Sequence, residues 1–186
     1  MRYLGVAVMA LLAASAAQAQ LWHSPTLVVG AAGGVTWELS PDSRPDQDTY
    51  YNNSIMPSLF VGLPVMGDTM VRLRAIDLPH EVVNGDTTID SRLRGVVVGV
   101  DYFMVSTFGR TVFSGGLGTY KLDLEGSPTG DAAKLETWDF GWYVGVGEWV
   151  AMTKNTRLTF EIAYHTTAHP GRPQLVQAAL GVAFGF

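Results

Sequence analysis

The chain has 186 residues, a net charge of −5 at pH 7, 16% charged residues and no cysteine. This length suits one domain, and the lack of cysteine excludes disulfide bonds and thiolate metal sites. The charged fraction is well below the roughly 25% of soluble domains. The acidic balance argues against a nucleic-acid-binding protein, because such proteins carry a basic surface.

The first 19 residues have the pattern of a secretory signal peptide. Arg2 supplies a positive start, residues 3–14 form an apolar run, and Ala17 and Ala19 match a small-residue cleavage site. About a dozen apolar residues are too few to cross a bilayer as a helix. We therefore predict a signal peptide over residues 1–19 and cleavage near Ala19, so that the mature domain, residues 20–186, leaves the cytoplasm.

The mature domain alternates between apolar, glycine-rich segments and turns or polar loops. Segments of this length with a period of two match transmembrane strands of ~9–11 residues and exceed the usual soluble strand of ~5–6 residues. The pattern predicts an all-β fold, an eight-stranded antiparallel up-and-down transmembrane β-barrel. The predicted strands are Thr26–Trp37, Ser54–Leu63, Thr69–Leu78, Arg92–Met104, Thr111–Leu122, Trp138–Val150, Thr156–Thr166 and Gln174–Phe186. Pro57 predicts a bulge or local irregularity in the second strand, because proline cannot donate to the ladder.

The two faces of each predicted strand differ in a way that indicates their surroundings. Leu158, Phe160, Leu180 and Phe184 lie on large apolar faces, whereas the opposite faces carry small or polar residues. A soluble barrel would bury the large side chains. A narrow, glycine-rich interior with large side chains outward is typical of a membrane barrel.

The predicted connections alternate in length. Pro64–Asp68, Val105–Arg110 and Thr153–Asn155 are short, whereas the longer, polar connections are Glu38–Asn53, Pro79–Ser91, Asp123–Thr137 and Thr167–Pro173. Short periplasmic turns and long outer loops characterise outer-membrane barrels. This arrangement places both termini in the periplasm. Closure is required, because an open sheet edge in lipid leaves backbone groups unpaired.

Three stretches resemble the small outer-membrane β-barrel family, the OmpA/OmpX-like barrels: Ser114–Tyr120, Gly145–Glu161 and Gly181–Phe186. The resemblance implies an outer-membrane location in a Gram-negative-type bacterium, with outer-membrane lipid and lipopolysaccharide as surroundings. It also implies insertion by the barrel-assembly machinery, which would read a terminal signal that includes Phe184 and Phe186. It implies no single function, because such barrels serve as anchors, adhesins, enzymes and conduits.

Charged residues on the predicted inward faces form a candidate lumen network. Buried charges are costly unless they pair, so we expect a structural network of ion pairs. A polar conduit is the alternative, and an eight-stranded interior is narrow for one. The predicted members are Arg72, Arg74, Asp101, Lys121, Asp139, Arg157 and Glu161, with His165 nearby.

His165 and Thr167 are the weak catalytic candidates. Their spacing is similar to the His-x-Ser of barrel-type lipid A deacylases, in which histidine acts as base and serine as nucleophile. The departures are threonine in place of serine, Ala168 after it, and no acidic residue after Glu161 to orient the histidine. His165 and His169 have a spacing that suits a metal on a helix rather than on a strand, so no metal or cofactor site is predicted.

The favoured function is a non-enzymatic integral outer-membrane protein whose exposed loops serve envelope structure or surface interaction. The alternatives are a lipid A deacylase-like hydrolase and a soluble, lipocalin-like binder of an apolar ligand. Aromatic residues near strand ends are predicted to form interfacial belts. The candidates are Trp22, Trp37, Trp138, Trp142, Trp149, Tyr50, Tyr51 and Tyr102, and packing in the core is the alternative for any of them.

Overall fold

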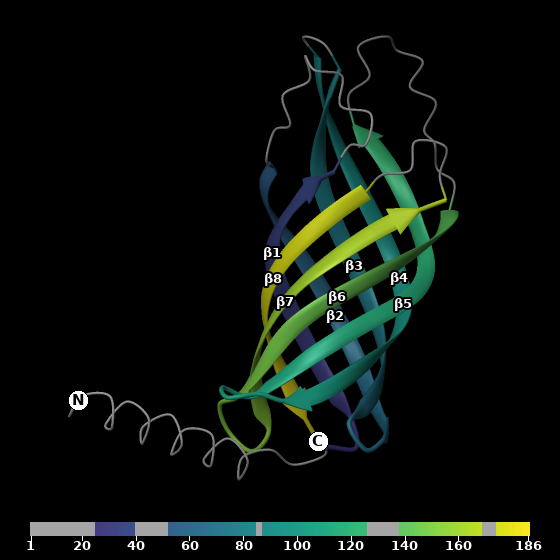
Figure 1. Cartoon of the computed structure of the whole chain (residues 1–186). Coiled ribbons are helices and arrows are strands. Elements are labelled where there is room, and N and C mark those ends of the chain that lie inside the picture. Colours follow the sequence, from purple (N-terminus) through teal and green to yellow (C-terminus); the bar gives the residue numbers. More distant parts are fainter. Residues whose placement is uncertain (1–24, 40–51, 85–86, 126–137, 169–173) are drawn as a thin grey trace, which may run out of the picture.

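The computed structural model describes residues 25–39, 52–84, 87–125, 138–168 and 174–186, which form a closed antiparallel barrel (Figure 1). Each strand pairs with the next, and β8 pairs with β1, so that no edge is left open in the described part. The strands are β1 (Val28–Glu38), β2 (Asn52–Met66), β3 (Thr69–Asn84), β4 (Thr87–Val105), β5 (Arg110–Glu125), β6 (Trp138–Ala151), β7 (Thr156–Thr167) and β8 (Gln174–Gly185). The predicted eight-stranded barrel is confirmed, whereas residues 1–19 lie outside the described residues.

The short connections lie together at one end of the barrel, which we call the turn end, and the C-terminus is at the same end (Figure 1). A two-residue turn at this end joins β2 to β3 and contains Gly67, whose φ is 53°. This left-handed conformation suits glycine, which has no Cβ to clash with the backbone. The opposite end of the barrel is the loop end.

Strands β3 and β4 run further toward the loop end than the sequence predicted. The prediction of a loop over Pro79–Ser91 is wrong. The β3–β4 ladder continues from the pair of Pro79 with Arg92 to the pair of Asn84 with Thr87. Valine, isoleucine and threonine are frequent in residues 82–89, and these types favour extended backbone. The segment therefore continues the β3–β4 strand pair and does not form a long loop.

The second strand does carry an irregularity, but it lies beside Pro57 and not at Pro57 itself. Pro57 pairs with Gly33, and the β1–β2 register shifts between Gly34 and Thr36. The strand pair therefore accommodates a residue without a backbone N–H next to a break in the regular ladder.

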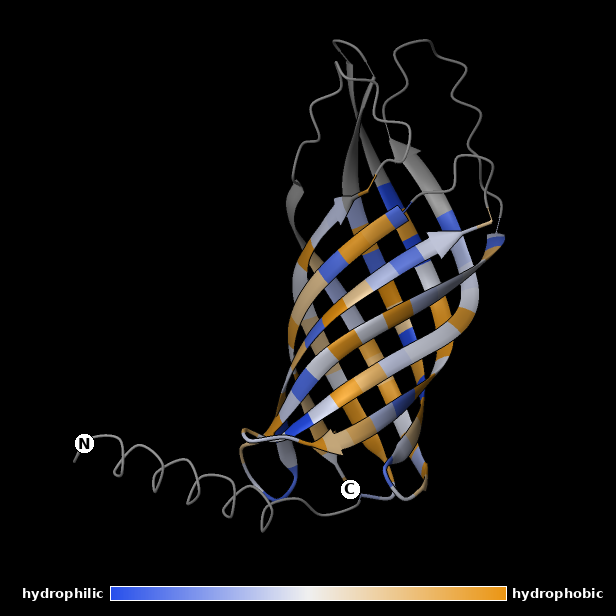
Figure 2. Cartoon of the chain, viewed as in Figure 1, coloured by the Kyte–Doolittle hydropathy of each residue, from blue (hydrophilic) through white to orange (hydrophobic). Residues whose placement is uncertain are grey.

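Hydrophobic and hydrophilic residues alternate along the strands (Figure 2), and the large hydrophobic side chains on the outer face form an apolar band. Leu158, Phe160, Leu180 and Phe184 are 37%, 46%, 57% and 47% exposed. A lipocalin-like barrel would turn these side chains into a ligand cavity, so their orientation argues against that alternative. An apolar outer surface of this kind is favourable when it faces lipid. In the described part of the chain, no helix is long and apolar enough to cross a membrane.

The interior is filled by three layers of side chains. The layer at the turn end is apolar, the middle layer is charged, and the layer toward the loop end combines polar groups with a second apolar cluster. The first apolar cluster contains Val28, Phe60, Met70, Phe103, Val112, Trp149 and Ala183. The second contains Met56, Ile76, Leu78, Leu93, Val97, Tyr120, Tyr143, Leu175 and Ala179.

Candidate functional site

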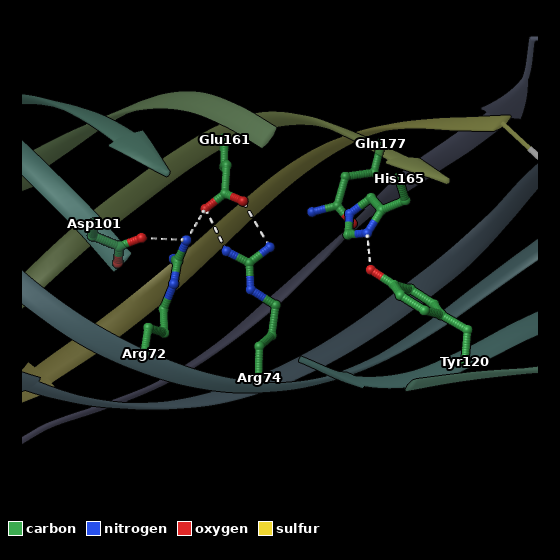
Figure 3. Close-up of polar contacts among 7 residues, drawn as sticks. All are labelled: Arg72, Arg74, Asp101, Tyr120, Glu161, His165 and Gln177. Carbon is green, nitrogen blue, oxygen red and sulfur yellow. Dashed lines mark hydrogen bonds and ion pairs between the residues drawn. The ribbon is translucent and has the colours of Figure 1, made fainter. Parts of the chain in front are cut away.

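Four charged side chains meet in the middle layer of the barrel (Figure 3). Arg72 of β3 lies 2.9 Å from Asp101 of β4 and 3.0 Å from Glu161 of β7, between Nη2 and carboxylate oxygens. Arg74 of β3 lies 2.7 Å from Glu161, between Nη1 and Oε1. The period of two brings both arginines to the inward face of β3, and Leu73 between them points outward. We call these four residues the charge cluster.

The charge cluster balances two guanidinium groups against two carboxylates, and each side chain is at most 8% exposed. Arg72 also lies over the ring of Phe60, 5.4 Å from its centroid, and Arg74 over Tyr143 at 5.2 Å. Cations attract the negative faces of aromatic rings. Buried charges that are paired in this way connect strands that are far apart in the sequence.

The interior beside the charge cluster has little free space. A gap among Ser58, Arg72, Arg74, Thr159 and Glu161 has room for about one water molecule. A gap of this size is too small for a solute to pass.

The other members of the predicted lumen network lie elsewhere. Arg157 is 1% exposed at the turn end, where it lines a pocket with Trp149. Asp139 lies on the inward register of β6, opposite Tyr120. The prediction for Lys121 is wrong. Because Tyr120 points inward and is buried, its neighbour Lys121 shares the outward register and pairs with Arg94 and Trp138.

His165 is enclosed by polar and aromatic side chains inside the barrel. Its Nε2 lies 3.1 Å from Oε1 of Gln177, and its Nδ1 lies 3.1 Å from the hydroxyl of Tyr120 (Figure 3). Its ring stacks on Tyr143, with centroids 5.4 Å apart and planes 18° apart. Since the amide oxygen only accepts, Nε2–H donates to Gln177, and Nδ1 of the neutral ring accepts from Tyr120.

This environment opposes the hydrolase alternative. His165 is 0% exposed, Thr167 is 6% exposed, and both face inward. A general base needs an unoccupied nitrogen within reach of the nucleophile and of the substrate. Both ring nitrogens of His165 have other partners, and the lipid-facing surface is on the far side of the barrel wall. His169, the second half of the proposed metal pair, lies outside the described residues.

The residues that the sequence did not single out are the tyrosines and the glycines facing them. A Cβ added to Gly99 would lie 2.1 Å from the hydroxyl oxygen of Tyr143, and one added to Gly116 would lie 2.7 Å from the same ring. Gly95 and Gly141 similarly make room for Tyr120. The signal was available, because these glycines fall on inward positions of adjacent strands.

The aromatic residues divide between the surface and the interior. Trp138, Trp142 and Tyr102 are 57%, 42% and 51% exposed. Trp149 follows the alternative of core packing, because it is 1% exposed and packs edge-on against Phe103 at 5.2 Å. Trp37 is half-buried. Trp22, Tyr50 and Tyr51 lie outside the described residues.

The two residues of the predicted assembly signal point outward at the turn end. Phe184 is 47% exposed and Phe186 is 67% exposed. The backbone N–H of Phe186 donates to the carbonyl of Leu27 at 2.9 Å, and the carbonyl of Phe186 accepts from Thr26. The last residue therefore extends the seam between β8 and β1.

Comparison with known proteins supports the architecture. No protein-family model matches the sequence, and no curated protein shows significant similarity to it. Among solved structures, Neisserial surface protein A (NspA) is similar over 87% of this chain and 97% of its own, with 15% identity and a TM-score of 0.65.

Two further structures have the same architecture. The N-terminal β-barrel domain of Pseudomonas aeruginosa OprF covers 88% of this chain and 100% of its own, with 17% identity and a TM-score of 0.59. Ail of Yersinia pestis covers 86% and 96%, with 13% identity and a TM-score of 0.55. At these identities the likeness concerns the fold. The chain thus has the fold of the small eight-stranded outer-membrane barrels.

Proposed function

We propose that this chain is a non-enzymatic integral protein of a bacterial outer membrane, whose loops serve surface interaction or envelope structure. The observation that carries the proposal is the orientation of the barrel. Large apolar side chains such as Phe160 and Leu180 face outward, and the paired charges Arg72 and Glu161 face inward. Only a lipid environment makes this arrangement favourable on both faces.

The filled interior supports a non-enzymatic role. His165, the residue with the strongest catalytic pattern, is held by Tyr120 and Gln177 and is 0% exposed. Apolar clusters lie on both sides of the charge cluster. These features favour the role of a rigid scaffold that presents loops. They do not favour the role of a catalyst or of a wide channel.

The proposed partners are outer-membrane lipid and lipopolysaccharide around the barrel, and the barrel-assembly machinery during insertion. For the loop end, Ail of Yersinia pestis was solved in complex with the heparin analogue sucrose octasulfate, and that structure has a TM-score of 0.51 and 14% identity to this chain. An acidic chain of net charge −5 is a poor general partner for sulfated sugars. We therefore propose neutral or cationic surface groups as the partners to test first.

The experiment that tests the location is fractionation of the expressing bacterium, followed by gel migration of boiled and unboiled samples. We expect the chain in the detergent-requiring outer-membrane fraction, with different migration before and after boiling. A chain recovered in the soluble periplasmic extract without detergent contradicts the proposal.

The experiment that tests the non-enzymatic role is mass spectrometry of lipid A from cells with and without the chain. We expect identical acylation patterns. Loss of an acyl group that depends on the chain, and that disappears in His165→Ala, would establish the hydrolase instead.

A further inference from the structure

The turn end of the barrel contains a pocket that is open to solvent. Phe103 and Trp149 of the first apolar cluster line it, and so does Gly67 of the β2–β3 turn. Val28, Met70 and Phe103 supply an apolar wall. The pocket is separate from the charge cluster and from the loop end, so it serves neither part of the proposed function.

The charged residues of this pocket are unequal in number. Arg110 and Arg157 line it together with one carboxylate, Asp68. Arg110 forms a close ion pair with Asp68, and Arg157 is the second guanidinium group among the described lining residues. Arg157 is 1% exposed, so its charge sits in a poorly hydrated place.

The indole of Trp149 supplies an independent observation. It lines the same pocket, it is 1% exposed, and its Nε1–H has no hydrogen-bond partner in the described structure. An indole N–H only donates. A buried donor without an acceptor is uncommon and costs about 1–3 kcal/mol. A ligand with an acceptor oxygen would satisfy it.

We propose that this pocket binds a small organic carboxylate. The carboxylate lies toward Arg157 and accepts from the Trp149 indole, and its apolar part contacts Val28 and Met70. A guanidinium presents a fork of donors that matches a carboxylate. The enclosed part of the pocket holds about three water-sized groups, which suits a carboxylate head group, and the rest of the ligand extends through the open mouth.

The test uses the full mature barrel in detergent micelles, with ¹⁵N-labelled tryptophan indoles followed by NMR. The Trp149 resonance is identified by its loss in Trp149→Phe. Titration with hexanoate should shift this resonance in a saturable way. Hexanamide, which keeps the chain and lacks the charge, should bind at least tenfold more weakly.

Two sources of carboxylate are compared directly. Hexanoate represents a free acid, and N-acetyl-Ala-Ala, with its terminal carboxylate, represents a peptide end. Binding of either supports the proposal, and the tighter one identifies the source. If neither shifts the Trp149 resonance at millimolar concentration, the proposal is overturned.

The matched variants separate a site from a general charge effect. Arg157→Gln should weaken hexanoate binding at least tenfold. Lys154→Gln removes one positive charge from an exposed turn at the same end and should change binding less than twofold. Should Arg157→Gln fail to fold, Arg110→Gln serves as the second lining variant. Equal effects of the lining and turn variants would overturn the proposal.

Discussion

Glu161 of β7 binds two arginines of β3 across the interior, with its Oε2 3.0 Å from Nη2 of Arg72 and its Oε1 2.7 Å from Nη1 of Arg74. β7 and β3 are not neighbours in the sheet. A single carboxylate therefore connects opposite walls of the barrel, and its removal leaves two buried guanidinium groups with Asp101 alone.

We accordingly expect Glu161→Ala to lower the free energy of unfolding by about 3–5 kcal/mol, because it leaves a buried charge uncompensated. Denaturant titration of the barrel in micelles, followed by unboiled gel migration, measures the change. Asp77→Asn is the control, since Asp77 pairs with Arg92 and Arg94 at 3.9 and 3.7 Å on the outer face. There we expect at most about 1 kcal/mol. Equal losses for the two variants would contradict the bracing role.

Gly99 faces the hydroxyl of Tyr143, and the two residues should behave as a coupled pair. Gly99→Ala places a Cβ 2.1 Å from that oxygen, so we expect a loss of about 1–3 kcal/mol from overpacking. Tyr143→Phe in the same chain removes the nearest clashing atom and should recover part of the loss, whereas the carbonyl oxygen of Gly115 stays 2.8 Å from the added Cβ. Gly115→Ala, whose Cβ would meet its nearest atom at 3.7 Å, is the control. Additive effects of Gly99→Ala and Tyr143→Phe would show that they do not interact.

Leu180 lies on the outer face of β8, beside Phe160 of β7. We expect Leu180→Arg to destabilise the barrel by about 2–4 kcal/mol in bilayers, because a lipid-facing arginine is costly near the midplane. Met152→Arg changes an exposed residue at a turn and should cost little. The measurement is the folded fraction in lipid vesicles across a denaturant series. An equal response at both positions would argue against a lipid-facing band at Leu180.

His165 stabilises the interior toward the loop end through hydrogen bonds with Tyr120 and Gln177. His165→Ala should lower the free energy of unfolding by about 1–3 kcal/mol, because it leaves buried polar groups without partners. His165→Gln, which keeps a donor and an acceptor, should lose less. Denaturant titration compares the two variants, and a larger loss in His165→Gln would exclude hydrogen bonding as the reason.

Phe186 tests the predicted assembly signal. We expect Phe186→Ala to reduce the amount of folded barrel in cells several-fold, because the terminal aromatic is the proposed recognition element. The same variant refolded in micelles should keep nearly all its stability, since β8 still pairs with β1 from Leu175 to Gly185. Phe113→Ala, an outward aromatic on β5, is the control. Equal cellular loss for the two variants would remove the special role of the C-terminus.

The sequence by itself determined the strand number and the lipid-facing side of each strand. Both follow from a period of two, which is a local property of the backbone. Leu158, Phe160, Leu180 and Phe184 were therefore assigned correctly. The same rule would have placed Lys121 outward beside Tyr120, and its charge alone misled the prediction.

Only the tertiary structure decided which inward residues meet. The stagger of a closed barrel sets which side chains share a level, and no local pattern encodes it. This stagger joins Glu161 to Arg72 and Arg74, and places Arg157 at the turn end. It also brings Trp149, which the period of two already turns inward, beside Phe103. Contacts across the barrel depend on closure, which brings together residues far apart in the chain.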